Sequence, residues 1–125
     1  MKEPTYIILY VSDMPVSMAF YTNILGKAPV ESSPGFSLFV LESGWKLGLW
    51  TKQEVKPAAD MTGGGAEIGL MLDSQEAVDT ALDYMSAMQA KVIQAPTQMD
   101  FGYTFVVLDP DEHRIRVFCP SEIVR

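Results

Sequence analysis

The chain has 125 residues, 48% of them hydrophobic and 20% charged, which is the composition of one folded domain and not of a disordered segment. Its 16 acidic and 9 basic residues give a formal charge of −7, which disfavours binding to nucleic acid or to anionic membranes, because both attract basic patches. The single cysteine, Cys119, cannot form an internal disulfide, and the sequence contains no signal-peptide pattern and no apolar run of membrane-spanning length. We therefore expect a cytoplasmic protein with neither nucleic acid nor membrane among its partners.

The first half of the chain changes from a strand pattern to a helical one and back. Residues 5–11, TYIILYV, form an apolar run of strand length, and residues 12–26 have helical spacing. Ser12 or Asp13 can cap the start of this helix, because both side chains accept hydrogen bonds from backbone N–H groups. Three short strands are predicted next, over residues 27–33, 35–42 and 45–52.

The second half repeats this order after a polar segment, residues 53–65, that contains Pro57 and three successive glycines and is predicted to be a linker. A strand, a helix and three strands are predicted over residues 66–72, 73–90, 91–96, 102–109 and 114–119. The sequence therefore predicts an α+β fold, a single domain over residues 1–125 built from two βαβββ modules, about 5–52 and 66–119. Each module has one helix for one face of its sheet, so the uncovered face must meet the other half, a second chain or a ligand.

Two motifs resemble those of a known family. The first helix opens with V-S-D-M-P-x-S-x-x-F-Y-x-x-I-L-G at residues 11–26, and the last turn reads D-P-D-x-H-x-I at residues 109–115. Together with the two βαβββ modules, they resemble the vicinal oxygen chelate superfamily, which includes glyoxalase I, extradiol dioxygenases and bleomycin-resistance proteins. The resemblance implies that the sheets form a cup, usually completed in a homodimer.

The metal-binding positions of that family hold unsuitable residues in this chain. Its metalloenzymes carry a histidine seven residues before Asp13, a second one at the start of the second module and a glutamate three residues after His113. Here these positions are Tyr6, Glu67 and Arg116. A guanidinium is a permanent cation without a lone pair to donate, so it repels a metal ion. We therefore predict neither a metal nor any other cofactor.

If the resemblance holds, Glu67 and Arg116 project from neighbouring strands into the same cup, where opposite charges pair because a lone buried charge is costly. Arg116 also predicts a preference for a ligand with a carboxylate or carbonyl group. The segments EIGLML (67–72) and HRIRVFCP (113–120) most resemble a branch of phenazine-antibiotic resistance proteins, whose members bind an aromatic antibiotic without modifying it. In that branch a tryptophan lies against the ligand, and Trp50 in LGLW matches it.

Strand alternation extends this candidate pocket to other side chains. Aromatic residues in strands are often core residues, and Glu67 with Arg116 can equally be a structural pair. With these alternatives open, the predicted ligand-binding residues are Trp50, Arg116, Glu67, Tyr6, Phe39, Met71, Tyr103 and Phe118. No catalytic residue is predicted.

The sequence thus favours a metal-independent binding protein that sequesters a planar aromatic small molecule, plausibly an antibiotic. One alternative is a metal-dependent lyase, isomerase or dioxygenase of the same superfamily, with ligands not identified above. The other is an interaction module, whose cup would be filled by its own side chains.

Overall fold

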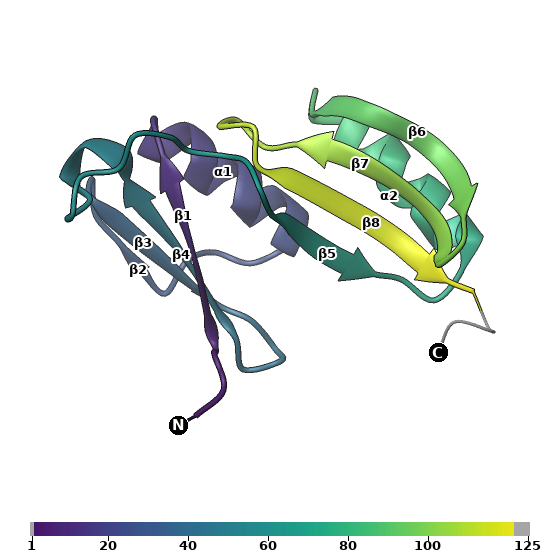
Figure 1. Cartoon of the computed structure of the whole chain (residues 1–125), viewed down its shortest axis with the longest axis horizontal. Helices are drawn as coiled ribbons and strands as arrows, with labels where there is room; N and C mark the ends of the chain where they lie inside the picture. The colour runs from purple at the N-terminus through teal and green to yellow at the C-terminus, as the bar shows by residue number, and fades with distance from the viewer. Residues whose placement is uncertain (1, 122–125) are drawn as a thin grey trace. The chain divides into compact units, whose positions relative to one another are not determined.

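The computed structural model describes residues 2–121 and divides the chain into two compact units, one up to Gly63 and one from Gly64 (Figure 1). Each unit contains one helix and one four-stranded sheet in the order strand, helix, three strands. The α+β class and the two βαβββ modules predicted from the sequence are therefore confirmed.

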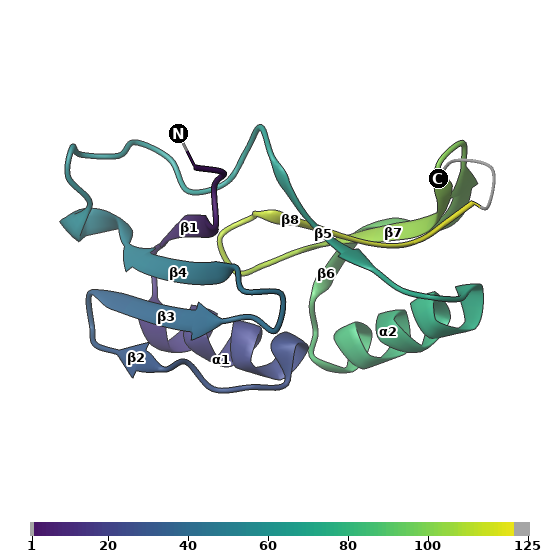
Figure 2. The same cartoon turned by 90° about the horizontal axis from the view of Figure 1, so that it is seen from below.

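The first unit is a mixed sheet with one helix against one of its faces (Figure 2). Its elements are β1 (Tyr6–Val11), α1 (Met14–Leu25), β2 (Glu31–Ser32), β3 (Phe36–Val40) and β4 (Lys46–Thr51), followed by a short 3₁₀ helix, η1 (Lys52–Glu54). The strand order is β1-β4-β3-β2, with β1 parallel to β4 and the other pairs antiparallel.

Local sequence explains where these elements begin and end. Asp13, and not Ser12, caps α1 by accepting a hydrogen bond from the Val16 N–H at 3.2 Å. Gly26 ends the helix in the left-handed conformation, with φ 70°. Strand β2 is much shorter than the predicted 27–33, in keeping with Pro29 and Pro34, which have no N–H to donate to a sheet.

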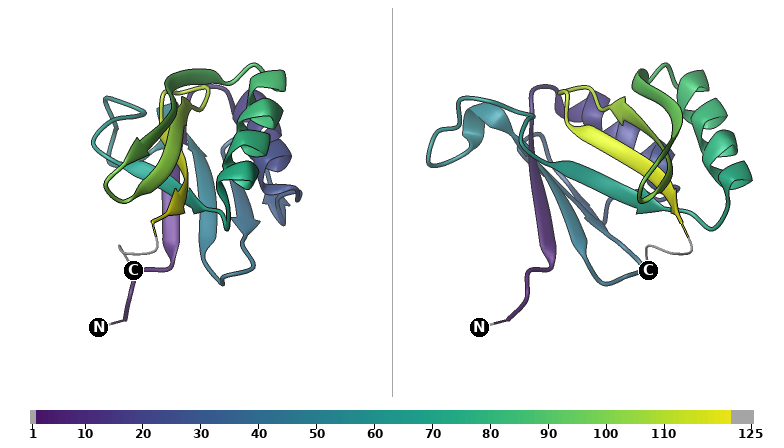
Figure 3. Two further views of the ribbon diagram at one scale, coloured as in Figure 1. Left: turned by 90° about the vertical axis from the view of Figure 1, so that its right-hand side faces the viewer. Right: turned by 45° about the vertical axis from the view of Figure 1, so that its right-hand side comes forward.

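The second unit repeats this arrangement with different side chains. Its elements are β5 (Glu67–Met71), α2 (Gln75–Ala87), β6 (Lys91–Met99), β7 (Gly102–Leu108) and β8 (Arg114–Pro120). The strand order is β5-β8-β7-β6, with β5 parallel to β8. Helix α2 lies along one face of this sheet (Figure 3). Strand β6 continues beyond the predicted 91–96, because Pro96 is tolerated in an edge strand.

The segment predicted as a linker, residues 53–65, is not uniform. Its first residues belong to the first unit, because Gln53 and Glu54 lie in η1 and the Val55 side chain is 4% exposed. Gly64 and Gly65 have positive φ angles, 133° and 72°, which glycine adopts without strain. The boundary between the two compact units falls between Gly63 and Gly64.

The core of each unit lies between its helix and its sheet. In the first unit Val11, Phe39 and Leu49 are 0% exposed, and the Ser37 hydroxyl contacts the Met14 sulfur of α1 at 3.4 Å. In the second unit the corresponding buried residues are Val78 of α2 with Phe105, Val107, Ile115 and Val117 of the sheet. The alternate residues of the strands consequently point to the opposite face, which carries the candidate functional side chains.

Candidate functional site

The sheet face opposite α1 is lined mainly by aromatic and aliphatic side chains and is called the aromatic face. It presents Tyr6, Ile8 and Tyr10 from β1, Phe36 from β3, and Lys46 and Trp50 from β4. Tyr6 and Ile8, which are neighbours on this face of β1, are 52% and 46% exposed. Such a surface, left uncovered by the unit itself, is a candidate contact surface for a ligand or partner.

Trp50 lies between two other rings on the aromatic face. Its indole is 6.3 Å from the Tyr10 ring at an interplanar angle of 79°, and 6.5 Å from the Phe36 ring at 82°. Edge-on packing of this kind is favourable and holds the indole in a defined orientation. At the other end of the face, the Lys46 ammonium lies 5.4 Å from the centroid of the Tyr6 ring. The aromatic face can therefore stack against a planar apolar molecule.

The sheet face opposite α2 is called the polar face, and Arg116 is at its centre. The Arg116 Nε donates to Glu67 Oε1 at 2.9 Å, and its NH2 group donates to Glu67 Oε2 at 3.0 Å. Its NH1 group donates to the side-chain oxygens of Gln94 and Thr104, at 3.1 and 3.3 Å. Arg116 is thus held in one orientation by a two-point ion pair and two further hydrogen bonds.

Two phenylalanines continue the polar face. The Arg116 guanidinium lies 5.6 Å from the centroid of the Phe101 ring, within the range of a cation–π contact. Phe101 in turn packs edge-on against Phe118, with 6.0 Å between the ring centroids. The Arg116 guanidinium is therefore both hydrogen-bonded to neighbouring side chains and in contact with an aromatic ring.

An open cavity of about 590 Å³ lies over this part of the second unit. It is lined by Ile93, Gln94, Val106, Leu108, Glu112, Arg114 and Arg116. The Arg114 side chain is 57% exposed and its NH1 is 4.0 Å from Glu67 Oε2, at the limit of an ion pair. Arg114 is therefore much more available to an incoming anion than Arg116, whose side chain is 19% exposed.

The Arg116 hydrogen bonds hold the pKa of the Glu67 carboxyl below its usual value. Partial burial acts in the opposite direction, and the positive charges of Arg116 and Arg114 lower the pKa further. Glu67 is therefore ionised at neutral pH and is a partner for Arg116, not an acid that donates a proton.

The residues at the family's metal positions do not fit a cation. Arg116 offers a positive charge in place of a lone pair, and both oxygens of Glu67 already accept hydrogen bonds from it. Within residues 2–121 no group of three His, Cys, Asp or Glu side chains is placed to hold a metal ion. His113 instead bonds the Asp109 carboxylate through Nδ1 at 2.7 Å, in a buried turn before β8.

The eight predicted ligand-binding residues lie on the aromatic face, on the polar face and on the helix-facing sides of the sheets. Trp50 and Tyr6 lie on the aromatic face, and four others lie on the polar face. Those four are Glu67, Met71, Arg116 and Phe118. Met71 is 62% exposed at the edge strand β5, opposite Phe118 in the register.

Phe39 and Tyr103 lie apart from the other six residues, because their side chains point toward the helices. Phe39 has the same strand phase as Ser37, which contacts α1, and it is 0% exposed, so it is a core residue. Tyr103 donates its hydroxyl to Asp79 Oδ1 of α2 at 2.7 Å. In β3 and β7, the residues on both sides of the strand include apolar ones. The alternation of side chains therefore did not indicate which set faces the helix.

Sequence reasoning also missed four residues of the two open faces: Phe36, Gln94, Phe101 and Thr104. Phe36 carries only a weak signal, as an aromatic residue in a predicted strand, because its position opposite Trp50 depends on the register of β3 and β4. Gln94 and Thr104 meet Arg116 only through the pairing of β6 with β7 and of β7 with β8. The irregular register of β6 leaves no sequence signal for Gln94.

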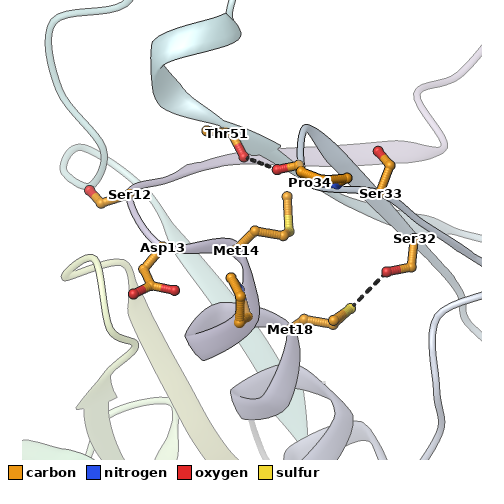
Figure 4. Close-up of a pocket in the computed structure, with 9 residues that line it drawn as sticks. Ser12, Asp13, Met14, Met18, Ser32, Ser33, Pro34 and Thr51 are labelled. Carbon is orange, nitrogen blue, oxygen red and sulfur yellow. Dashed lines mark hydrogen bonds between the residues drawn. The ribbon is translucent and has the colours of Figure 1, made fainter.

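A second cavity, of about 560 Å³, lies beside the N-terminal end of α1 (Figure 4). Met14 and Met18 extend from the helix toward the residues before β3, and the Ser32 hydroxyl contacts the Met18 sulfur at 3.1 Å. The Thr51 hydroxyl donates to the Pro34 carbonyl at 2.6 Å. Much of the polar lining is thus already hydrogen-bonded within the unit.

Two βαβββ units, each with one helix-covered and one open sheet face, define the class of fold to which this chain belongs. The model of the Glyoxalase/Bleomycin resistance protein/Dioxygenase superfamily matches residues 4–117, and the chain belongs to this superfamily. Over 122 residues it is 34% identical to the phenazine antibiotic resistance protein EhpR of Enterobacter agglomerans, covering 95% of this chain and 92% of EhpR. The resemblance deduced from the motifs is therefore confirmed.

Solved structures give the same result for the fold. A protein from Agrobacterium tumefaciens, determined by solution NMR, is 46% identical, with a TM-score of 0.87 and coverage of 97% of this chain and 99% of that one. A glyoxalase-related enzyme from Fulvimarina pelagi is 20% identical, with a TM-score of 0.85 and coverage of 95% and 88%. The second likeness concerns the fold alone. Separately, residues 2–121 include no helix long and apolar enough to cross a membrane.

Proposed function

We propose that this protein binds a planar aromatic compound of the phenazine class and confers resistance to it by sequestration. The observation that carries the proposal is Trp50, held edge-on by Tyr10 and Phe36 on an exposed aromatic face. The similarity to a phenazine antibiotic resistance protein supports the choice of ligand class. Sequestration requires only that the ligand be bound tightly, so no catalytic group is needed.

The polar face supplies a second feature of the proposed binding function. Four hydrogen bonds to protein groups already engage Arg116, so its role is to present a fixed guanidinium and to keep Glu67 ionised. Arg114 is more exposed and can reach a carboxylate or carbonyl group of a ligand. We propose that the polar face takes part in ligand binding through Arg114, and this contribution is tested separately from that of Trp50.

Binding is proposed to be independent of metal ions, because the donor set at the family's metal positions does not fit a cation. Homodimer formation and a cytoplasmic location stay predictions. An uncovered sheet face in each unit supports the dimer, since such a face is a common site of self-association.

The test is a tryptophan fluorescence titration against planar aromatic antibiotics, phenazine included, in metal-free buffer. Trp45→Phe serves as the matched control, because it removes the other tryptophan and leaves Trp50 in place. We expect saturable quenching in the wild type and in Trp45→Phe, and at least about tenfold weaker binding in Trp50→Leu, measured by calorimetry. Arg114→Ala is expected to weaken the binding of carboxylated ligands more than that of neutral ones.

Two outcomes contradict the proposal. Binding that survives unchanged in Trp50→Leu would remove the aromatic face from the site. Binding or turnover that begins only when Ni²⁺, Fe²⁺ or Zn²⁺ is added would favour an enzyme of the same superfamily.

A further inference from the structure

Gly48 is in the middle of β4, on the aromatic face, where its lack of a side chain has a specific consequence. It pairs with Ile8 of β1 and Leu38 of β3. A Cβ atom at this position would lie 2.8 Å from Cζ and 3.1 Å from Cε1 of the Phe36 ring. The ring tip of Phe36 therefore occupies the space that any other residue at position 48 would fill.

The register shows why this matters for Trp50. Phe36 is directly opposite Trp50 in the antiparallel pair of β3 and β4, where two large side chains normally pack against each other. Here the Phe36 ring leans along the strand over Gly48, and its plane makes an angle of 82° with the indole. Gly48 thus gives the ring a place to lie other than flat on Trp50.

We propose that Gly48 is a positioning residue that keeps the Trp50 indole available for stacking by accommodating Phe36. The inference rests on the proposed function and specifies the ligand further. Because Phe36 and Tyr10 flank the indole with their ring planes steeply inclined to it, we expect a flat fused-ring ligand to be preferred over one with bulky out-of-plane groups.

Gly69 provides a matched control in the other unit. It also lies on an open sheet face, but a Cβ atom there would be 3.5 Å from Cε1 of Phe118, an ordinary contact distance. Gly69→Ala is accordingly expected to leave its aromatic neighbour in place. Both substitutions replace glycine by alanine in a strand, so the difference in strand preference between these residues affects both variants alike.

The experiment compares Gly48→Ala, Gly69→Ala, Phe36→Leu and the double variant Gly48→Ala/Phe36→Leu, all in the Trp45→Phe background. Affinity for phenazine is measured by fluorescence titration, the Trp50 environment by near-UV circular dichroism, and stability by urea unfolding. We expect Gly48→Ala to bind phenazine about tenfold more weakly, to change the near-UV spectrum and to keep nearly the same unfolding midpoint. Gly69→Ala, which displaces no aromatic ring, should weaken phenazine binding much less than Gly48→Ala does.

The double variant separates positioning from a general loss of structure. Leucine has no ring tip over position 48, so Gly48→Ala should have little additional effect in the Phe36→Leu background. Equal phenazine affinity of Gly48→Ala and the parent would overturn the inference while leaving the proposed function intact. Failure of the parent itself to bind any planar compound would remove the proposed function, and this inference with it.

Discussion

The two units of this chain share one framework and differ in what they display. Both have the order βαβββ, the same strand arrangement and a core between helix and sheet. The open face of the first unit is dominated by Trp50, Tyr10 and Phe36 in edge-on contact. The open face of the second is organised by Arg116 and its ion pair with Glu67.

The difference shows that the framework constrains one side of each sheet and leaves the other free to specialise. The helix-facing side needs apolar side chains, because its burial stabilises the unit. The open side contributes less to folding, so one unit carries an aromatic surface and the other a charged network. Substitutions on the two sides should therefore separate stability from ligand binding.

The largest effect is expected from Phe39→Ala, compared with Phe36→Ala in the same strand. Phe39 is fully buried against α1, so truncation should cost about 3–5 kcal/mol of unfolding free energy. Phe36 lies on the open side, and its truncation should cost clearly less while weakening ligand binding. Urea unfolding followed by tryptophan fluorescence measures this, since both tryptophans are in the first unit. Equal costs for the two variants would show that the faces are not distinct.

An intermediate effect is expected in the second unit from Glu67→Gln. The paired Glu67 has a pKa below its usual value, so the ion pair contributes stability above the ordinary carboxyl pKa and loses it as the pH falls through the lowered pKa. We expect Glu67→Gln to lower the free energy of unfolding by about 1–2 kcal/mol at neutral pH. The estimate is modest because the ion pair, although it has two hydrogen bonds, is partly exposed to solvent.

The difference between wild type and Glu67→Gln should then shrink as the pH falls below the ordinary carboxyl pKa and through the lowered pKa of Glu67. Urea unfolding followed by far-UV circular dichroism at several pH values measures it. Glu42→Gln, in an exposed turn of the first unit, is the control. A pH-independent difference between wild type and Glu67→Gln would mean that the ionic contact adds nothing to stability.

The sequence was sufficient where one local signal determined the outcome. The start of the first helix was predicted to within one residue, at Ser12 or Asp13, and the structure selects Asp13. The pairing of Glu67 with Arg116 followed from their opposite charges at the family's metal positions. It was insufficient where both strand phases are apolar, so it did not show that Phe39 and Tyr103 face the helices. Gln94 and Thr104 were out of reach for another reason: their contact with Arg116 depends on strand register, which includes an irregular step in β6.

The smallest predicted effect concerns Tyr103, and the experiment tests the placement of its side chain against α2. The hydrogen bond to Asp79, with smaller contributions from partial desolvation and from the Asp79 charge, raises the pKa of the Tyr103 phenol. The contact therefore stabilises the protein below the ordinary tyrosine pKa and is lost as the pH rises through the raised value. In an alkaline absorbance titration of the wild type, the Tyr103 phenol should therefore ionise later than a free tyrosine.

The late ionisation should be absent in Tyr103→Phe and should return to the ordinary range in Asp79→Ala. Phenazine affinity should be unchanged in both variants, because Tyr103 faces the helix and not the polar face. A loss of affinity in Tyr103→Phe would return this residue to the binding surface. It would also show that the division into a stabilising side and a binding side does not hold in the second unit.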